Sequence, residues 1–197
     1  MYVLERDSKI VIEYNIRNDT VTRKQVKIDT NFPHNFQYCQ TPSERIFLIG
    51  GGDFNRIDAI SLTACTEILN TRSIAFDTIK KDKLRAPRHG HSITCLKDKF
   101  LVVTGSRIEK DDAHRSVEQY NIDMDIWFDL PNLNNGRYYH SSCVLADRWV
   151  YVFAGIANAT RKYFNSIERL DTTATGASKV WELLDFPVDQ FLSLIHI

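Results

Sequence analysis

Histidine and tyrosine side chains gather in two short segments of this chain, where they could bind a transition metal. One segment holds His89 and His91, and the other holds Tyr138, Tyr139 and His140. Imidazole is a common ligand of copper and zinc, so a metal site is the first chemistry to consider. However, His91 and His140 stand 49 residues apart in the same context, Arg-x-x-His-Ser. A metal site needs unlike positions that converge once, so we predict structural roles for both histidines and no bound metal or cofactor.

Two arginines and two glutamates recur in the same way. Arg88 and Arg137 open the two Arg-x-x-His-Ser segments, while Glu118 and Glu168 follow 30 and 31 residues later. A guanidinium can bond backbone carbonyls or hold a carboxylate through two hydrogen bonds. We therefore expect these arginines to join neighbouring repeats, and pairing with the glutamates is one arrangement that would do so.

The spacing of these residues defines a repeat of about fifty residues that contains four β-type runs. Apolar strands end at Gly105 and Gly155, an earlier copy ends at Gly51-Gly52, and Trp127 precedes Trp181 by 54 residues. Such a period with four strands is typical of a propeller blade. The predicted strands are 10–16 and 20–28, then 36–40, 45–50, 62–69 and 74–79, then 91–96, 99–104, 116–122 and 125–129, and finally 140–146, 149–154, 165–171 and 179–184.

These motifs together resemble the kelch repeat: Arg-x-x-His-Ser, a strand ending in Gly, a Glu-x-Tyr-Asn strand and a following Trp. The resemblance covers residues 10–185, although two copies read Thr104-Gly105 and Ala154-Gly155 where kelch strands usually end in Gly-Gly. It implies an all-β fold, a partial kelch-type β-propeller of about three four-stranded blades plus half a blade. The residues expected to repeat for structural reasons are Gly51, Gly52, Arg88, His91, Gly105, Glu118, Tyr120, Trp127, Arg137, His140, Gly155, Glu168 and Trp181.

The length is short for a closed ring, which in kelch proteins commonly needs six or seven blades. We divide the chain into an incomplete propeller at 1–186 and a tail at 187–197 that departs from the pattern. Within the propeller we expect a blade remnant at 10–28 and blades at about 36–79, 91–129 and 140–184. We expect a piece of a longer protein, and the alternative is a partial propeller that oligomerisation completes.

Composition narrows the class of partner. The chain has 25 basic and 25 acidic residues, so it lacks the basic excess of a nucleic-acid-binding protein. Its first residues lack the apolar core of a secretion signal, and no run of 18 apolar residues occurs. We therefore expect a cytoplasmic protein that binds neither nucleic acid nor membrane.

The four cysteines show no metal-ligand spacing. Cys39, Cys95 and Cys143 fall in the first predicted strand of three successive repeats, and Cys65 falls in a third strand. A free cysteine packs like a small apolar residue, so we predict buried thiols without disulfides.

The loops between the second and third strands differ from repeat to repeat and are the best candidates for function. In kelch domains these loops share one face, which commonly binds partner proteins, as the resemblance implies. Variable loops on a rigid scaffold are how many binding surfaces are built. The predicted partner-binding residues are Arg56, Arg107, Arg115, Arg161, Lys162 and Tyr163.

Two classes of function therefore remain open. The first is a non-enzymatic kelch scaffold or adaptor that binds a protein partner. The second is a kelch-type enzyme such as a copper oxidase or a sugar epimerase. An oxidase would carry copper, whereas an adaptor would not.

Overall fold

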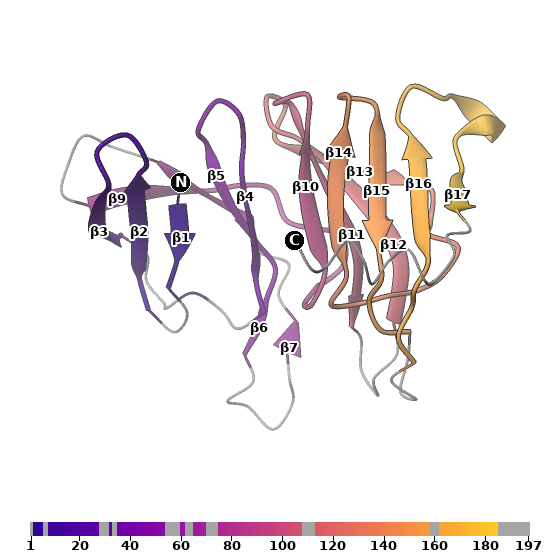
Figure 1. The fold of residues 1–197 in the computed structure, drawn as a ribbon, viewed down its shortest axis with the longest axis horizontal. Helices are drawn as coiled ribbons and strands as arrows, with labels where there is room; N and C mark the ends of the chain where they lie inside the picture. Colours follow the sequence, from indigo (N-terminus) through magenta and orange to yellow (C-terminus); the bar gives the residue numbers. More distant parts are fainter. Residues whose placement is uncertain are drawn as a thin grey trace. The chain divides into compact units, whose positions relative to one another are not determined.

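Alternating apolar and polar side chains place most of the chain in short β-strands joined by turns (Figure 1). The computed structural model describes residues 2–5, 8–27, 32, 35–53, 60–61, 65–69, 75–107, 113–157 and 162–184. The chain forms two compact units, residues 1–89 and residues 90–197. We call them unit 1 and unit 2 and describe each by itself.

Unit 1 contains the remnant of a repeat and one further repeat. Its strands are β1 (Tyr2–Leu4), β2 (Ile10–Asn15), β3 (Thr20–Val26), β4 (Gln37–Gln40), β5 (Ile46–Ile49), β6 (Gly52–Asp53), β7 (Ile60–Ser61), β8 (Cys65–Leu69) and β9 (Ala75–Lys80). Seven of them form one sheet in the order β1-β2-β3-β9-β8-β5-β4, and β6 pairs with β7.

The hairpin predicted at 10–28 is present as β2 and β3, but it continues the sheet of the next repeat. The junction is a short parallel pairing in which Gln25 lies opposite Ala75 and Val26 lies opposite Phe76. A parallel contact of two residues has no signature in the sequence, and β1 was not predicted. The core of unit 1 is formed by Leu4, Val11, Val26, Phe32, Ile46, Leu48 and Ile68.

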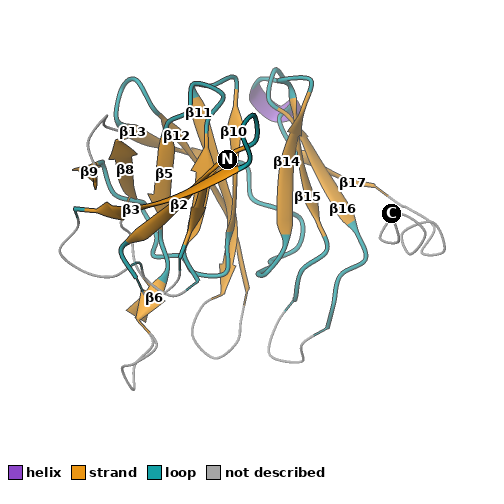
Figure 2. Ribbon diagram, turned by 60° about the vertical axis from the view of Figure 1, so that its left-hand side comes forward, coloured by secondary structure: helices purple, strands orange, loops and turns teal. Residues whose placement is uncertain are grey.

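Unit 2 contains two four-stranded antiparallel sheets with consecutive strand order, as propeller blades have (Figures 1 and 2). The first sheet consists of β10 (Ser92–Leu96), β11 (Phe100–Arg107), β12 (Ala113–Asn121) and β13 (Ile126–Leu130). The second consists of β14 (Ser141–Leu145), β15 (Trp149–Phe153), β16 (Ile167–Asp171) and β17 (Trp181–Leu184), with a 3-10 turn at Gly176–Ser178. The strands predicted at 91–129 and 140–184 are therefore confirmed.

The first hairpin of each sheet is closed by a tight turn with a left-handed backbone. In the first sheet Lys97 and Asp98 have φ of 55° and 52°, and in the second Ala146 and Asp147 have 52° and 49°. Two consecutive residues with positive φ match the twist of the flanking strands. The second turn is centred on Ala146-Asp147 and not on the polar pair Asp147-Arg148, which the sequence alone would favour.

The core of unit 2 lies between its two sheets. It is formed by Leu96, Val102, Val117, Leu133, Val150, Val152, Leu170 and Trp181. Burial of one such side chain stabilises a fold by about 1.5–3 kcal/mol. Trp181 also donates a 2.8 Å hydrogen bond from its indole nitrogen to the carbonyl of Pro131, so it ties the second sheet to the segment that precedes it.

The cysteines are free, as predicted for the three whose side chains the structure describes, but the prediction that they are buried is wrong. Cys39 and Cys95 are half-buried and Cys143 is exposed. Cys95 shares a face of the first sheet with its partner Leu101, and Cys143 shares a face of the second sheet with its partner Tyr151. These two faces are not equivalent in the repeat. Position within a first strand does not determine burial, because neighbouring residues of a strand face opposite ways.

Candidate functional site

A buried ion pair joins the second sheet of unit 2 to the segment that leads into it. Nη2 of Arg137 lies 2.5 Å from Oε1 of Glu168, and neither side chain has any solvent-exposed surface. Glu168 also accepts hydrogen bonds from the backbone N–H groups of Asn134 and Asn135, at 2.6 and 3.1 Å. The pairing of the repeated arginine with the repeated glutamate is therefore confirmed for this repeat, but the pair lies within one repeat and does not join neighbouring repeats as predicted.

Arg137 has further contacts that fix its place. Nη1 donates to the carbonyls of Ala154 at 2.8 Å and Ser166 at 3.4 Å, and the guanidinium lies 4.7 Å from the ring centre of Phe164. Burial lowers the pKa of Arg137, and the charge of Glu168 opposes that shift. This pair is the structural centre of the repeat, and both terminal nitrogens of the guanidinium donate hydrogen bonds to protein groups.

The equivalent residues of the other repeats are also buried. Arg88 and Glu118 are both buried. A third glutamate, Glu67, was not predicted, although Glu67-Ile68-Leu69-Asn70 shares the Glu and the Asn of the same motif. Arg45 holds Glu67 with two hydrogen bonds of 2.7 and 3.0 Å, and Lys81 lies 3.0 Å away. Burial alone raises the pKa of Glu67, but these two cations outweigh it and lower the pKa below its ordinary value.

The repeated histidines lie inside the fold. His91 is buried, and His140 is buried with its Nε2 atom 2.8 Å from the hydroxyl of Thr104. The His140 ring packs on Gly105, where an added Cβ would lie 2.7 Å from Cε1 of His140 and 2.2 Å from the carbonyl oxygen of Arg137. Among the described residues, no three His, Cys, Asp or Glu side chains come close enough together to hold a metal ion.

The glycines at strand ends adopt left-handed conformations, with one difference from the motif. Gly105 and Gly155 have φ of 58° and 97°. In the earlier repeat the left-handed pair is Gly50-Gly51, at 62° and 102°, whereas Gly52 begins β6. Ala154, at 54°, therefore occupies a conformation that glycine adopts more easily.

Four of the six predicted partner-binding residues are described, and they lie at one edge of unit 2. This loop edge consists of residues 105–107, 113–116, 131–140, 153–157 and 162–167. Backbone hydrogen bonds hold it together: Ser106 N to Arg137 O, Arg137 N to His114 O, Leu133 N to Arg115 O, and both N–H···O pairs between Tyr138 and Ile156. Arg56 and Arg161 lie outside the described residues.

The predicted residues have different contacts within the loop edge. Lys162 and Tyr163 are exposed, and the exposed fraction of Tyr163 is 75%. Arg115 is also exposed, but its Nε donates a 2.8 Å hydrogen bond to the carbonyl of Leu133. The guanidinium of Arg107 lies 5.9 Å from the ring centre of Tyr138. Tyr138 and Tyr139 also lie on this edge and were not predicted as partner-binding residues.

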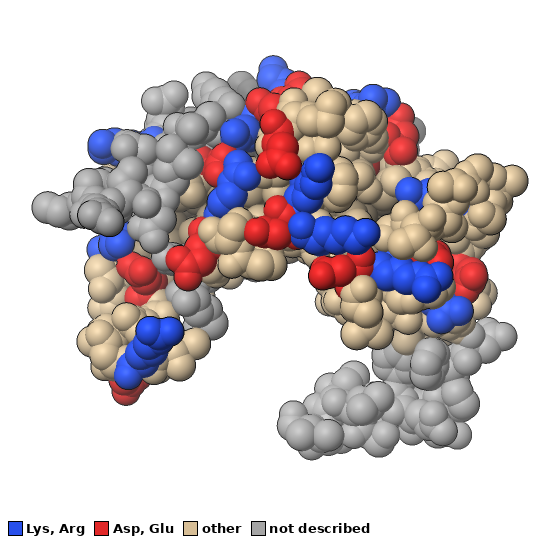
Figure 3. Space-filling model, turned by 90° about the horizontal axis from the view of Figure 1, so that it is seen from above, with Lys and Arg blue, Asp and Glu red and all other residues tan. Residues whose placement is uncertain are grey.

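The loop edge differs in charge from the opposite edge of unit 2, where the hairpin turns lie. The described residues of the loop edge contain no Asp or Glu, and Arg107, Arg115 and Lys162 are its cations with solvent-exposed surface, since Arg137 is buried and paired with Glu168. The hairpin edge intersperses both signs (Figure 3), with Lys97, Asp98, Lys99, Asp123, Asp125, Asp147, Arg148 and Lys179. Over residues 105–116, 131–140 and 153–167 the sequence has basic residues at 107, 110, 115, 137, 161 and 162 and acidic ones at 109, 111 and 112. The loop edge is thus the more basic of the two.

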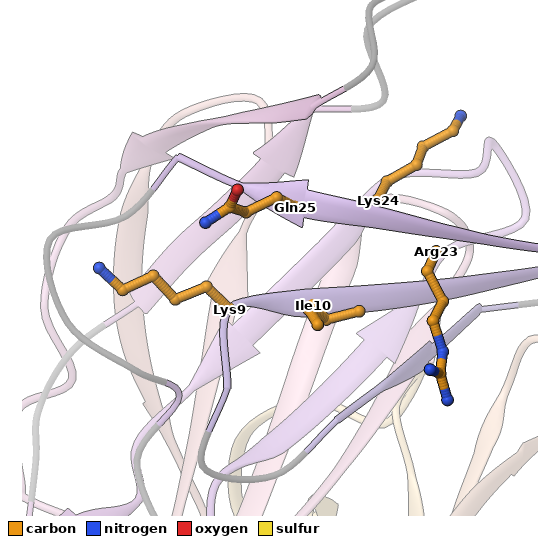
Figure 4. A pocket seen from close by; sticks show the side chains of 5 residues that line it. All are labelled: Lys9, Ile10, Arg23, Lys24 and Gln25. Carbon is orange, nitrogen blue, oxygen red and sulfur yellow. The ribbon is translucent and has the colours of Figure 1, made fainter.

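A cavity in unit 1 does not qualify as a second site. It has a volume of about 570 Å³ and is lined by Lys9, Ile10, Arg23, Lys24 and Gln25. The lysine and arginine side chains point away from one another (Figure 4), and Lys24 pairs with Glu13 at 2.9 Å. A ligand would therefore not meet converging charges there.

Comparison with known proteins supports the fold and not an activity. No protein-family model matches the chain, and no curated protein matches it. A solved structure titled "Structure of YjhT" is similar to it, with a TM-score of 0.67, 11% sequence identity and 90% of this chain covered. The match spans 52% of that protein's chain, about half its length. The likeness agrees with the predicted all-β, partial β-propeller fold. No helix in the described part of the chain is long and apolar enough to cross a membrane.

Proposed function

We propose that this chain is a non-enzymatic protein-interaction module, a kelch-type scaffold or adaptor that binds a partner protein through the loop edge. The observation that carries this proposal is the presence of Tyr139 and Tyr163, exposed by 49% and 75%, beside exposed Arg115 and Lys162. Tyrosine and arginine are enriched among residues that dominate binding energies, because they offer rigid amphipathic area and forked hydrogen bonds.

The rigidity of the support favours the same proposal. The buried Arg137–Glu168 pair and the backbone hydrogen bonds of the loop edge fix the segment from Pro131 to His140 to both sheets. A surface that is already ordered loses little conformational entropy when it binds. The kelch resemblance adds that loops at this position commonly contact partner proteins in that family.

The test is a pull-down from native lysate that compares wild type with a variant in which Arg107, Arg115, Arg161 and Tyr163 are changed to Ala together. We expect the variant to lose its partners while its thermal melt stays close to that of wild type. The matched control removes three cations from the hairpin edge, Lys97→Asn, Lys99→Ala and Lys179→Ala, and should keep every partner. A folded loop-edge variant that still captures all partners would show that this edge is not the binding surface.

Elemental analysis separates the adaptor from the oxidase alternative. We expect the chain, purified without added metal, to carry no stoichiometric copper or zinc, since His91 and His140 recur by repeat and are buried in it. One tightly held copper ion per chain would favour the enzyme.

A further inference from the structure

The backbone of Tyr139 is unusual for such a large residue. Its φ is 50°, in the left-handed region, and its counterpart 49 residues earlier is Gly90, with φ of 61°. Left-handed backbone is easy for glycine, but it is disfavoured for a residue with a bulky side chain. The repeat that forms the second sheet of unit 2 therefore has a tyrosine at the position where the preceding repeat has Gly90, the residue that suits this conformation.

The surrounding structure holds Tyr139 in this conformation. Its backbone N–H donates a 2.7 Å hydrogen bond to the carbonyl of Gly90. Its ring lies across Gly90, so closely that a Cβ added there would be 2.8 Å from Cε1 of Tyr139. The ring of Tyr138 meets it edge-on, with 5.2 Å between ring centres. The contacts with Gly90 and Tyr138 thus hold one side of Tyr139 in place, while 49% of its surface remains exposed.

Tyr138, whose ring contacts that of Tyr139, is itself in contact with a basic residue and is linked through the backbone to a second exposed tyrosine. Arg107 lies over the ring of Tyr138, and Ile156 bridges Tyr138 to Tyr163. Strained backbone persists where the surroundings over-determine it and is found disproportionately at binding sites. Tyr139 has such a backbone, and its aromatic ring is half-exposed. The described residues of the loop edge around it include no Asp or Glu.

We propose that Tyr139 is the anchor of the loop edge and that its ligand is an acidic peptide segment. The peptide lays an apolar side chain on the exposed part of the Tyr139 ring, and its carboxylates face the cations of the same edge, Arg107 and Lys162 among them. The inference rests on the proposed function and adds to it the central residue and the chemistry of the partner. The strained backbone keeps the ring presented in one orientation, which lowers the entropy cost of binding.

The decisive variant is Tyr139→Gly, because Gly90 shows that glycine suits this backbone. A displayed library of random short peptides is selected on the full wild-type chain, and the enriched peptides are synthesised and titrated. We expect them to be acidic, to share an apolar residue and to bind more weakly as salt is raised. We expect Tyr139→Gly to bind them at least about tenfold more weakly and to melt at the wild-type temperature or above.

Tyr151→Ser is the matched control, since Tyr151 is a half-buried tyrosine on the side of the second sheet, away from the loop edge. It should bind the peptides as wild type does. Tyr139→Asn is a second variant that also tolerates left-handed backbone, so a folding defect in one replacement does not decide the outcome.

Three results overturn the anchor. They are an absence of enriched peptides, enriched peptides without an acidic excess, and unchanged affinity in both Tyr139 variants. If affinity falls in the combined loop-edge variant but not in the Tyr139 variants, the proposed function stands and the anchor fails. If neither variant weakens binding, both fail.

Discussion

The two sheets of unit 2 have the same strand pairing but present their equivalent faces to different surroundings. Leu96 of the first sheet is 3% exposed, whereas its counterpart Leu145 in the second is 58% exposed. Val102 is fully buried against the second sheet, while the equivalent Tyr151 is half-buried. The face of the first sheet that bears Leu96 and Val102 is thus covered. The equivalent face of the second sheet, which bears Leu145 and Tyr151, is exposed, and we call it the open face.

The open face is aromatic and bordered by charged residues. Tyr151 and Phe153 stack on it with ring centres 6.1 Å apart. Trp149 lies between two guanidinium groups, those of Arg148 at 4.6 Å and Arg169 at 4.5 Å from its ring centre. Asp171 and Glu182 hold these arginines in turn. Each repeat therefore encodes an apolar face on its sheet. Where no further sheet covers that face, arginine side chains lie over its aromatic rings in cation–π contacts.

Glu168 and Glu182 lie on opposite faces of the second sheet and give the largest expected contrast. Glu168→Gln should lower the free energy of unfolding by about 3–5 kcal/mol, because it leaves the Arg137 guanidinium buried without a counter-charge. Glu182→Gln removes only the exposed pair with Arg169 and should have no measurable effect. Urea unfolding of both variants measures the difference, and equal losses would abolish the distinction between the faces.

The double variant Arg137→Met with Glu168→Leu sharpens this result. Removing both charges together should cost less than removing Glu168 alone, since no unpaired charge stays buried. A double variant that is less stable than Glu168→Gln would assign the effect to packing around this pair.

Leu96→Ala and Leu145→Ala compare the covered and open faces at equivalent positions. Leu96→Ala should cost about 2–5 kcal/mol, the usual effect of a cavity in a packed core. Leu145→Ala should change stability by less than about 0.5 kcal/mol. Thermal and urea unfolding provide the measurement. A large loss at Leu145 would mean that its face is covered in solution.

Gly105→Ala and Gly176→Ala separate backbone strain from steric conflict. Both glycines have φ of 58°, but an added Cβ meets the Arg137 carbonyl at 2.2 Å in the first case and nothing within 4 Å in the second. We expect a loss of about 3 kcal/mol for Gly105→Ala and about 1 kcal/mol for Gly176→Ala. Similar midpoints for the two variants would show that the close approach at Gly105 relaxes without cost.

Ala154→Gly should give the smallest effect, and of opposite sign. Glycine relieves the left-handed strain at φ of 54° but adds freedom to the unfolded chain, so we expect a gain of about 0.5 kcal/mol. Differential scanning calorimetry can detect it as a slightly higher midpoint. A lower midpoint would mean that the Ala154 methyl group contributes packing that outweighs its strain.

The strands of unit 2 could be predicted from the sequence because their signals are local. Alternation with period two, a left-handed turn and a terminal glycine recur within each repeat, so Trp127 and Trp181 fall at equivalent paired positions. Pairing of Arg137 with Glu168 was foreseen as one arrangement because both recur together.

Burial and partners depended on packing that the sequence does not display. Cys143 is exposed because its face of the second sheet is open, and Glu67 is held by Arg45 and Lys81 from its own unit. Tyr139 could have been noticed, since a tyrosine replaces Gly90 of the preceding repeat. Its positive φ and its place on Gly90, however, follow only from the fold.

The three tryptophans give unit 2 a built-in fluorescence signal from its interior and from the open face of the second sheet. Trp127 and Trp181 are buried, so their emission should lie at shorter wavelengths and resist quenching by iodide. Trp149, which is half-exposed and contacts two arginines, should emit at longer wavelengths and be accessible to iodide. A molecule that binds to the open face would therefore shield Trp149 from iodide. The emission of Trp127 and Trp181 would still report whether the interior is folded.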